Sequence, residues 1–398
     1  MIEINQTCSL WTSSFKRLCF SSFLMFLSWY MLLAVLPPIM IERLELYPVS
    51  GGVICLLLTG AMLVLGPFYS YWIDTCKRKY MYMLSLTVMI SILFCYTIIN
   101  NEAELWMLCL AQGMAYGVGT LGIFTLSIDL TVSAQRSASN MIFSWLARLG
   151  MITGIALGTV LYLQYNFETV IHVSVVAEAI ALCAVLITRV PFRAPIGVRM
   201  CSFDRFLLPR GWLPMLNLIF VAVVPGLLII PSINDTEVYR FMAYEVMIPH
   251  FAAAGIGFLV SIFFMKFVWK DKKEVYAQTL IGLMVLFTAM LLPVFSVSSV
   301  VRFASFVLLG SGLGFITPKF LMMFVMLSKH CQRGTANMTY MLGWEIGVSL
   351  GIAISYYLVI NSLSETIFLA GLLSSALALF LFVWRTYPYL KKKKKREG

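Results

Sequence analysis

Four ionisable side chains stand inside long apolar stretches of the sequence, where they could bind an ion or exchange a proton. They are Arg148, Glu178, Lys319 and Glu345. A charge at the centre of a membrane helix costs roughly 2.5–3.5 kcal/mol on insertion scales, so such residues are usually paired or functional. Lys319 could bind an anionic group or, once desolvated, exchange a proton. The alternative is a structural lysine whose long side chain reaches the membrane surface.

Two histidines add groups that titrate near neutral pH. His172 and His250 both fall in apolar segments, and histidine changes charge in this pH range. They are candidates for proton transfer, with a hydrogen-bonded structural role as the alternative.

The segments that must position these residues are predicted to be transmembrane helices. Hydrophobic residues make up 61% of the chain and charged residues only 12%, whereas a soluble domain carries about 25% charged residues. The apolar residues form blocks of roughly twenty, the length that crosses about 30 Å of hydrocarbon as a helix. Helices satisfy their own backbone groups in lipid, and barrel strands would instead alternate apolar and polar residues. We therefore expect an all-α membrane protein.

Twelve spans are predicted, six on each side of a basic stretch at 189–211. We expect a first bundle over 1–188, a linker over 189–211 and a second bundle over 212–398. The predicted helices are 18–40, 50–73, 80–99, 106–128, 141–163, 169–188, 212–232, 244–266, 276–294, 303–327, 338–360 and 366–386.

The basic residues predict how the chain is oriented. One set of alternate loops holds nearly all of them, including Lys77–Lys79 and the terminal run Lys391–Arg396, while the opposite set holds Arg43 and Arg240, with Arg302 at a helix mouth. Lys and Arg are retained on the cytoplasmic side, so both termini are predicted to be cytoplasmic in the cell inner membrane. The terminal run should also contact anionic lipids. No basic recognition helix indicates nucleic acid as a partner.

The chain repeats itself at a spacing of 197 residues. Residues 135–158 align without a gap on residues 332–355, with eight identities in 24 positions against roughly two expected from composition. Asn140 meets Asn337 in this alignment. The repeat predicts two six-helix halves of the same topology, related by an axis along the membrane normal.

The segment after the second predicted helix resembles the loop between helices two and three of the major facilitator superfamily. In residues 66–79, Asp74, Arg78 and Lys79 match the family pattern Gly-x-x-x-Asp-Arg/Lys-x-Gly-Arg-Arg/Lys. In that family the aspartate and arginine belong to a cytoplasmic charge cluster that holds the two halves together. A loop charge that only sets the topology is the alternative. The positions that depart from the pattern are Ser70, Thr75 and Lys77.

A second resemblance concerns the cytoplasmic end of the fourth predicted helix. Asp129 and Arg136 resemble the acid-x6-Arg element that partners this loop in sugar-porter members of the superfamily. The second half keeps Arg333 but has Met326 in place of the acid, so the cluster is expected to be complete on one side only. Two unrelated loop charges are the alternative.

The fourth and fifth predicted helices are similar in part to drug–proton antiporters. Residues 112–115, Gln-Gly-Met-Ala, resemble an element whose coupling arginine is replaced here by Cys109. The glycines of the fifth helix echo the antiporter glycine motif, with Ile155 where proline is expected. Close helix packing is the alternative interpretation of these glycines.

The resemblance implies a twelve-helix major facilitator fold with two pseudo-symmetric six-helix bundles and a central cavity. Lys319 would line this cavity, whereas Glu178 falls on a helix that is peripheral in the family. His250 is a further proton candidate. The implied substrate-site candidates are Trp29, Tyr30, Gln112, Tyr116 and Asn217.

Arg148 and Glu345 occupy the same repeat position with opposite charge. Each is predicted about eight residues inside its helix, or roughly 12 Å deep at 1.5 Å per residue. We expect the two to form a cytoplasmic gate that pairs when the cytoplasmic side closes. The alternative is a pair of Arg148 with Asp129 inside one half.

The sequence thus predicts a secondary active transporter that works by alternating access, acting as a monomer on a small molecule with a proton or sodium as coupling ion. Export of a small amphiphilic or anionic compound by antiport is the first expectation. Uptake of a sugar or organic anion is the second, and a non-transporting sensor or membrane-embedded enzyme remains open. The nine cysteines include no CxxC pair, and no Walker-type loop occurs. We expect no cofactor, no metal site and no enzymatic activity.

Overall fold

The computed structural model describes residues 9–191, 200–202, 206–234, 237–241, 244–268, 275–296, 298–329 and 332–397. Twelve helices in these ranges are long and apolar enough to cross a membrane, which confirms the predicted number. The first half contains α1 (Ser13–Arg43), α2 (Ser50–Val64), α3 (Tyr69–Thr75), α4 (Arg78–Cys95), α5 (Glu102–Asp129), α6 (Arg136–Gln164) and α7 (Phe167–Leu186). The second half contains α8 (Trp212–Asn234), α9 (His250–Phe267), α10 (Val275–Phe295), α11 (Ser299–Leu327), α12 (Arg333–Ile360), α13 (Ile367–Leu381) and α14 (Tyr387–Glu397).

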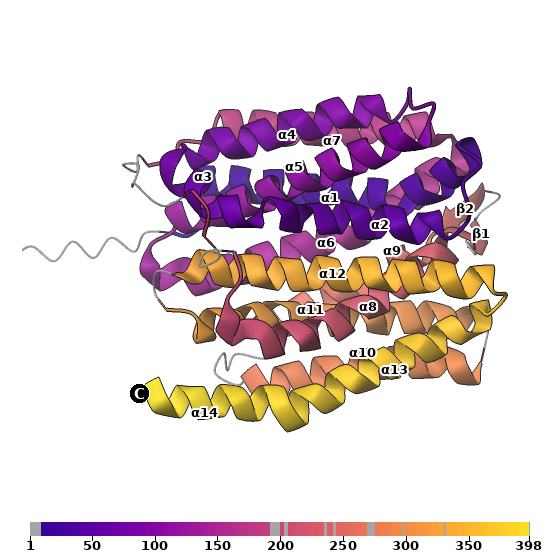
Figure 1. Cartoon of the computed structure of the whole chain (residues 1–398). Helices are drawn as coiled ribbons and strands as arrows, with labels where there is room; N and C mark the ends of the chain where they lie inside the picture. The colour runs from indigo at the N-terminus through magenta and orange to yellow at the C-terminus, as the bar shows by residue number, and fades with distance from the viewer. Residues whose placement is uncertain are drawn as a thin grey trace, which may run out of the picture.

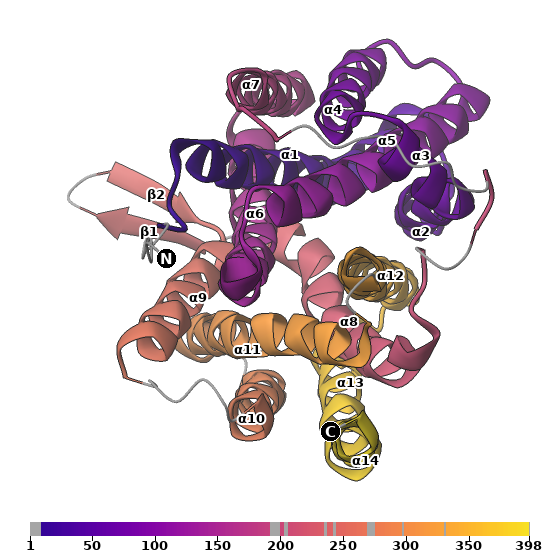
Figure 2. The ribbon, with the colours of Figure 1, turned by 90° about the vertical axis from the view of Figure 1, so that its left-hand side faces the viewer.

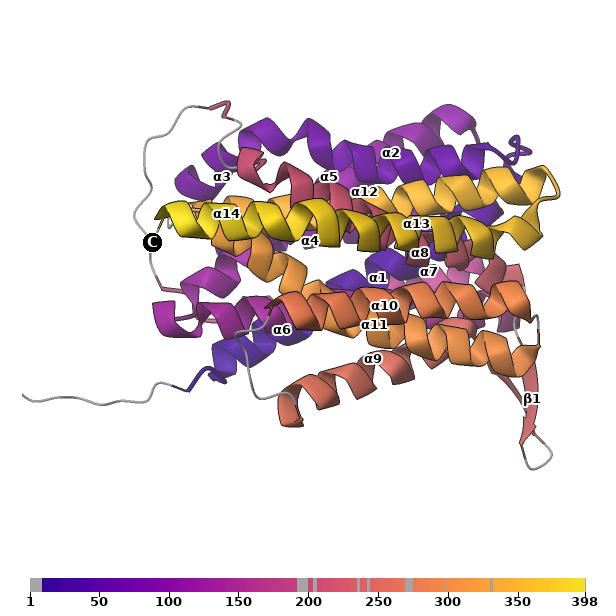
Figure 3. The ribbon, with the colours of Figure 1, turned by 90° about the horizontal axis from the view of Figure 1, so that it is seen from below.

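The helices are arranged as two groups that follow the two halves of the sequence (Figure 1). Seen along the helix axes, α1–α7 lie on one side and α8–α14 on the other (Figure 2). The halves touch where α2 packs on α12 and where α6 packs on α9 and α11. Helix α1 begins and α14 ends at the same end of the molecule (Figure 3). We call this end the terminal face and the other end the opposite face.

The helix boundaries keep the spacing of the sequence repeat. Helices α4, α5 and α6 begin at Arg78, Glu102 and Arg136, and α10, α11 and α12 each begin 197 residues later. The caps repeat as well. The Asn101 side chain accepts from the Glu104 amide at the start of α5, and the Ser298 hydroxyl accepts from the Val301 amide at the start of α11. Short polar caps satisfy amides that a helix start leaves free, so equivalent caps start equivalent helices.

Close packing between helices follows the repeat too. Gly113 places α5 directly against the Leu58 carbonyl of α2, and Gly310 places α11 directly against the Ala254 carbonyl of α9. A Cβ at either glycine would overlap with that oxygen. Gly150, Gly154 and Gly158 likewise bring α6 against α1, which favours the packing interpretation of these glycines over a transport motif.

The region before α9 differs from the prediction of one helix over 244–266. It contains an antiparallel hairpin of β1 (Glu237–Phe241) and β2 (Tyr244–Ile248) at the opposite face (Figure 3). Pro249 stands between β2 and α9 with an extended backbone. Proline has no backbone N–H, so it fits the position before a helix or its first turn, and it disfavours helix in the residue before it. Helix α9 accordingly begins at His250.

The last helix continues past its predicted end at residue 386. A π-helical turn over Phe382–Thr386 joins α13 to α14, whose helix runs through the basic tail to Glu397. The side chains of Lys394, Lys395 and Arg396 lie outside the described part of the chain, as do residues 192–199 and 203–205 of the predicted linker.

Candidate functional site

A buried ion pair joins the two halves near the middle of their helices. Nη2 of Arg148 in α6 lies 3.6 Å from Oε1 of Glu345 in α12, and both side chains are fully buried. Each residue stands twelve positions after the start of its helix, at Arg136 or Arg333. At 1.5 Å per residue this is about 18 Å, so the predicted depth of about 12 Å is wrong. Both helices begin earlier than expected, and the pair is central rather than close to a gate.

Two tyrosines of the first half donate hydrogen bonds to the glutamate. The hydroxyl of Tyr30 in α1 donates to Oε1 of Glu345 at 2.7 Å, and that of Tyr116 in α5 donates to the same oxygen at 3.2 Å. The other carboxylate oxygen, Oε2, has no hydrogen-bond partner among the described residues. One oxygen of a second-half carboxylate thus receives two hydroxyl groups and a guanidinium of the first half.

The guanidinium of Arg148 has few strong hydrogen-bond acceptors around it. Its Nη1 donates to the Tyr30 hydroxyl at 3.3 Å, and its Cζ lies 4.1 Å from the centre of the Trp344 ring. The remaining contacts are with the sulfur atoms of Met151 and Met341 at 4.0 and 3.7 Å. Thioether sulfur is a weak acceptor, and Nε has no partner within the described chain. N–H groups of the Arg148 guanidinium therefore remain available to a stronger hydrogen-bond acceptor.

Aromatic and amide groups form the neighbouring wall. The rings of Trp29 and Tyr116 are stacked with centroids 3.7 Å apart and planes 3° apart. Gln112 lies one turn from Tyr116 on the same face of α5, is fully buried, and has no hydrogen bond on either amide atom in the described structure. The arrangement could hold an anionic group at Arg148 beside flat apolar surfaces, and could move a proton at Glu345.

A second contact between equivalent residues of the two halves lies closer to the terminal face. Nδ2 of Asn337 donates to Oδ1 of Asn140 at 3.4 Å, again between residues 197 positions apart. Nearby, the Trp145 indole donates to the Gly314 carbonyl at 3.0 Å, which links α6 to α11. The halves therefore meet through equivalent residues of α6 and α12 at two levels. The repeat contained the signal for the Asn140–Asn337 contact, which our site prediction missed.

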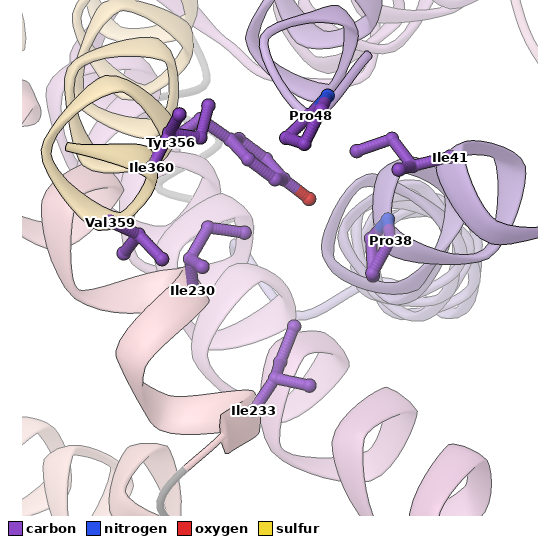
Figure 4. A pocket seen from close by; sticks show the side chains of 8 residues that line it. All are labelled: Pro38, Ile41, Pro48, Ile230, Ile233, Tyr356, Val359 and Ile360. Carbon is purple, nitrogen blue, oxygen red and sulfur yellow. The ribbon is translucent and has the colours of Figure 1, made fainter. Parts of the chain in front are cut away.

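At the opposite face, residues of both halves line a small, partly open apolar pocket of about 220 Å³ (Figure 4). The Tyr356 hydroxyl points into it and has no hydrogen-bond partner within the described chain. Arg148 and Glu345 do not line it. The residues that do are Pro38, Ile41, Pro48, Ile230, Ile233, Tyr356, Val359 and Ile360.

Comparison with known proteins identifies the family. A sequence model of the Major Facilitator Superfamily matches residues 18–331. The chain belongs to the Major Facilitator Superfamily. No curated protein matches its sequence.

Solved structures of superfamily (MFS) transporters share its fold. The human organic anion transporter MFSD10 (TETRAN) superposes with a TM-score of 0.69 at 14% identity, covering 93% of this chain and 98% of that one. A point mutant of the nucleoside transporter NupG gives 0.66 at 16% identity, covering 93% and 99%. A bacterial homolog of the human lysosomal transporter Spinster, inward-facing and occupied, gives 0.61 at 16% identity, covering 96% of both. Family and neighbours point to a transporter rather than an enzyme.

The charge motif of this MFS protein forms a compact cluster at the terminal face. Arg78 binds both carboxylate oxygens of Asp129 at 2.7 and 2.8 Å, and lies 3.8 Å from Asp74. These contacts join α3 and α4 to the end of α5, within the first half. Asp129 thus partners the loop, as the resemblance implies, and the alternative pair of Arg148 with Asp129 is not formed.

Lys79 has a different role from the one predicted. Its Nζ donates to the carbonyls of Leu186 and Thr188 at 2.9 Å each, and Arg17 donates to the Ile187 carbonyl at 3.1 Å. Helix ends leave carbonyls free, and cations stabilise them. Lys79 therefore caps α7 instead of joining the charge cluster.

Arg136 and Arg333, also predicted for the gate, occupy the first positions of α6 and α12. In the parts of the chain that the structure describes, neither forms an ion pair. The contact between halves at this level is made by Asn140 and Asn337 instead.

Three of the predicted substrate or proton residues, Asn217, His250 and Lys319, make none of the contacts that the ion pair forms in the described structure. Asn217 donates to the Ala378 carbonyl and the Thr386 hydroxyl at 3.1 Å each, inside the second half, which corrects its assignment to the cavity. His250 is the first residue of α9, not an interior one, and stacks on Phe306 at 5.0 Å. Lys319 is buried in α11, nearer its end at Leu327 than its start. The predicted aromatic residues do lie at the ion pair: Tyr30 and Tyr116 bond to Glu345, and Trp29 stacks on Tyr116.

Proposed function

We propose that this protein carries a small organic anion across the membrane together with a proton, by alternating access between its halves. The buried pair of Arg148 and Glu345 is the observation that carries this proposal. It stands between the two halves. Besides the ion pair with Glu345, the contacts of the guanidinium with hydrogen-bond acceptors in the described structure are to one hydroxyl and two thioether sulfurs.

Arg148 is the proposed anion-binding group. A guanidinium binds carboxylate, sulfate or phosphate groups through parallel charge-assisted hydrogen bonds. With the site empty of substrate, Glu345 neutralises this cation. A substrate anion therefore competes with Glu345 for Arg148.

The competition links the anion to a proton. Once displaced, Glu345 is a buried carboxylate without its cation, a state that costs several kcal/mol. Taking up a proton removes this charge. Anion and proton therefore bind together, which is the requirement for symport.

Symport favours the second of our two expectations, uptake of an organic anion, when the proton gradient points toward the terminal face. Export by antiport would need anion binding and proton binding to exclude each other. The contact between Arg148 and Glu345 instead supports joint binding of the anion and the proton.

The surroundings favour an anion with a flat apolar part. The stacked Trp29 and Tyr116, together with Trp344 and two methionines, surround the pair. Aromatic side chains bind such groups by stacking. That one structure of this fold is named as a human organic anion transporter agrees with the proposal.

A binding experiment on the purified protein tests the proposal. Thermal unfolding is followed with benzoate and a panel of aromatic carboxylates, each paired with its uncharged alcohol. We expect carboxylates to stabilise wild type, and not Arg148→Gln. In Glu345→Gln, which lacks the competing charge, binding should tighten and depend less on pH than in wild type. Equal stabilisation by the alcohols, or by carboxylates in Arg148→Gln, would overturn the assignment.

We further propose that the terminal face is cytoplasmic. Lys16, Arg17, Lys77 and the basic helix α14 lie at that end, and positively charged segments are retained in the cytoplasm. A reporter fused after Gly398 should be active only in its cytoplasmic form. We keep the division into bundles 1–188 and 212–398, since α7 ends at Leu186 and α8 begins at Trp212.

A further inference from the structure

A second buried carboxyl group lies inside the first half, away from the ion pair. Glu178 of α7 is fully buried, and its Oε1 accepts a hydrogen bond from the Ser28 hydroxyl of α1 at 2.8 Å. Its other oxygen, Oε2, has no hydrogen-bond partner in the described structure. Helix α7 stands at the edge of the bundle (Figure 2), yet this side chain is directed inward to α1.

The surroundings of Glu178 contain hydroxyl groups. Tyr82 of α4 is the titratable group that faces it, and this tyrosine is hydrogen-bonded to Ser21 of α1 at 2.9 Å. Among the described residues of α1, α4, α6 and α7, the helices packed here, no lysine, arginine, histidine or second acid faces or pairs with Glu178. A charged carboxylate without a cation is costly in such a place, so a bound proton is the natural partner.

The structure also connects Glu178 to the central site through three consecutive residues of α1. Ser28 bonds to Glu178, Trp29 stacks on Tyr116, and Tyr30 bonds to Glu345. A rotation of α1 about its axis would change all three contacts at once. The state of Glu178 can therefore bias the hydrogen bond between Tyr30 and Glu345.

We propose that Glu178 is a second proton-binding site, which couples proton uptake to the rotation of α1. The proton forms an O–H bond at Oε2 and is later returned to water, with no redox change. When the proton leaves, the charged carboxylate draws the Ser28 and Tyr82 hydroxyls toward it and turns α1. The inference rests on the proposed proton coupling and adds a site outside the substrate-binding residues.

The chemistry favours a proton over sodium at this position. Hard cations take several oxygen ligands, whereas one hydroxyl oxygen bonds to Glu178. Within the described residues, no cluster of three acids, histidines or cysteines could hold a metal ion.

Infrared difference spectroscopy of the whole protein in lipid tests the site without any substrate. We expect a protonated-carboxyl band in wild type that titrates with pH and is absent in Glu178→Gln. In Ser28→Ala the band should remain, with a shifted titration midpoint. Glu168→Gln changes an exposed carboxyl on the same helix and should leave the band unchanged. A band that persists in Glu178→Gln, or that does not titrate, would overturn the proposal.

Transport in proteoliposomes then separates a coupling role from a structural one. Glu178→Gln keeps the shape of the neutral side chain, so it should fold and exchange benzoate across the membrane with a flatter pH profile than wild type. An internal pH dye should record fewer protons per anion. A wild-type pH profile and proton ratio in this variant would refute the coupling role. Failure of the benzoate assay in wild type would contradict the proposed function alone, since the infrared result does not depend on it.

Discussion

Arg148 and Glu345 occupy equivalent positions of the two halves, 197 residues apart, and their side chains meet at 3.6 Å between α6 and α12. An axis that relates two halves brings residues near it close to their own counterparts. The pair is therefore a direct consequence of the repeat, with opposite charges at one position. Asn140 and Asn337 show the same relation one level closer to the terminal face.

A charge swap tests whether this pair acts as a unit. Arg148→Glu and Glu345→Arg should each abolish transport and lower stability by about 3–5 kcal/mol, since each places two like charges together in a buried site. The double variant restores opposite charges and should regain part of the transport and part of the stability. Transport is measured as flux in proteoliposomes, and stability by thermal unfolding. A double variant no better than the singles would show that the two residues act separately.

The asparagine contact predicts a way to stop the halves from separating. In a variant without native cysteines, Asn140→Cys and Asn337→Cys joined by a short thiol-cleavable reagent should block transport, because alternating access requires this seam to open. Cleaving the linker should restore the flux. Asn140→Cys alone, treated in the same way, is the control. Unchanged flux in the cross-linked protein would exclude opening at this level.

The glycine contacts predict matched effects on stability. Gly113→Ala and Gly310→Ala should each lower the free energy of unfolding by about 1–3 kcal/mol, because the added methyl overlaps a backbone carbonyl. Gly60→Ala is the control, since no atom lies within 4 Å of a Cβ built there. It should be neutral or slightly stabilising in the same thermal unfolding assay. Equal losses at all three positions would mean that helix flexibility, not contact, explains the glycines.

The cluster at the terminal face predicts a graded response. Asp74→Asn should leave the protein folded and inserted, because acids contribute little to membrane orientation. It should nevertheless slow transport strongly, because it removes the negative charge beside Arg78. Asp129→Asn should also lower stability, since Asp129 makes the shorter, two-pronged contact with Arg78. Flux and membrane insertion are measured together. Wild-type flux in Asp74→Asn would leave this residue with a packing role only.

The sequence by itself determined the number of helices and the register between the halves. Both depend on local properties. An apolar block of about twenty residues must be helical in lipid, and the gapless repeat assigns each residue its counterpart. The equivalence of Arg148 with Glu345 and of Asn140 with Asn337 therefore follows from the order of the amino acids alone.

Only the tertiary structure decided which way the polar side chains of these helices face. A soluble helix reveals its buried side by the periodicity of its apolar residues, but a membrane helix is apolar all round, so its pattern does not distinguish lipid from interior. Tyr30 and Asn217 were equal candidates in the sequence. The fold turns Tyr30 toward Glu345 and places Asn217 between α8 and α13 within the second half. It also makes Ser28, which no sequence pattern distinguishes, the partner of Glu178, because only the packing of α7 on α1 brings them together.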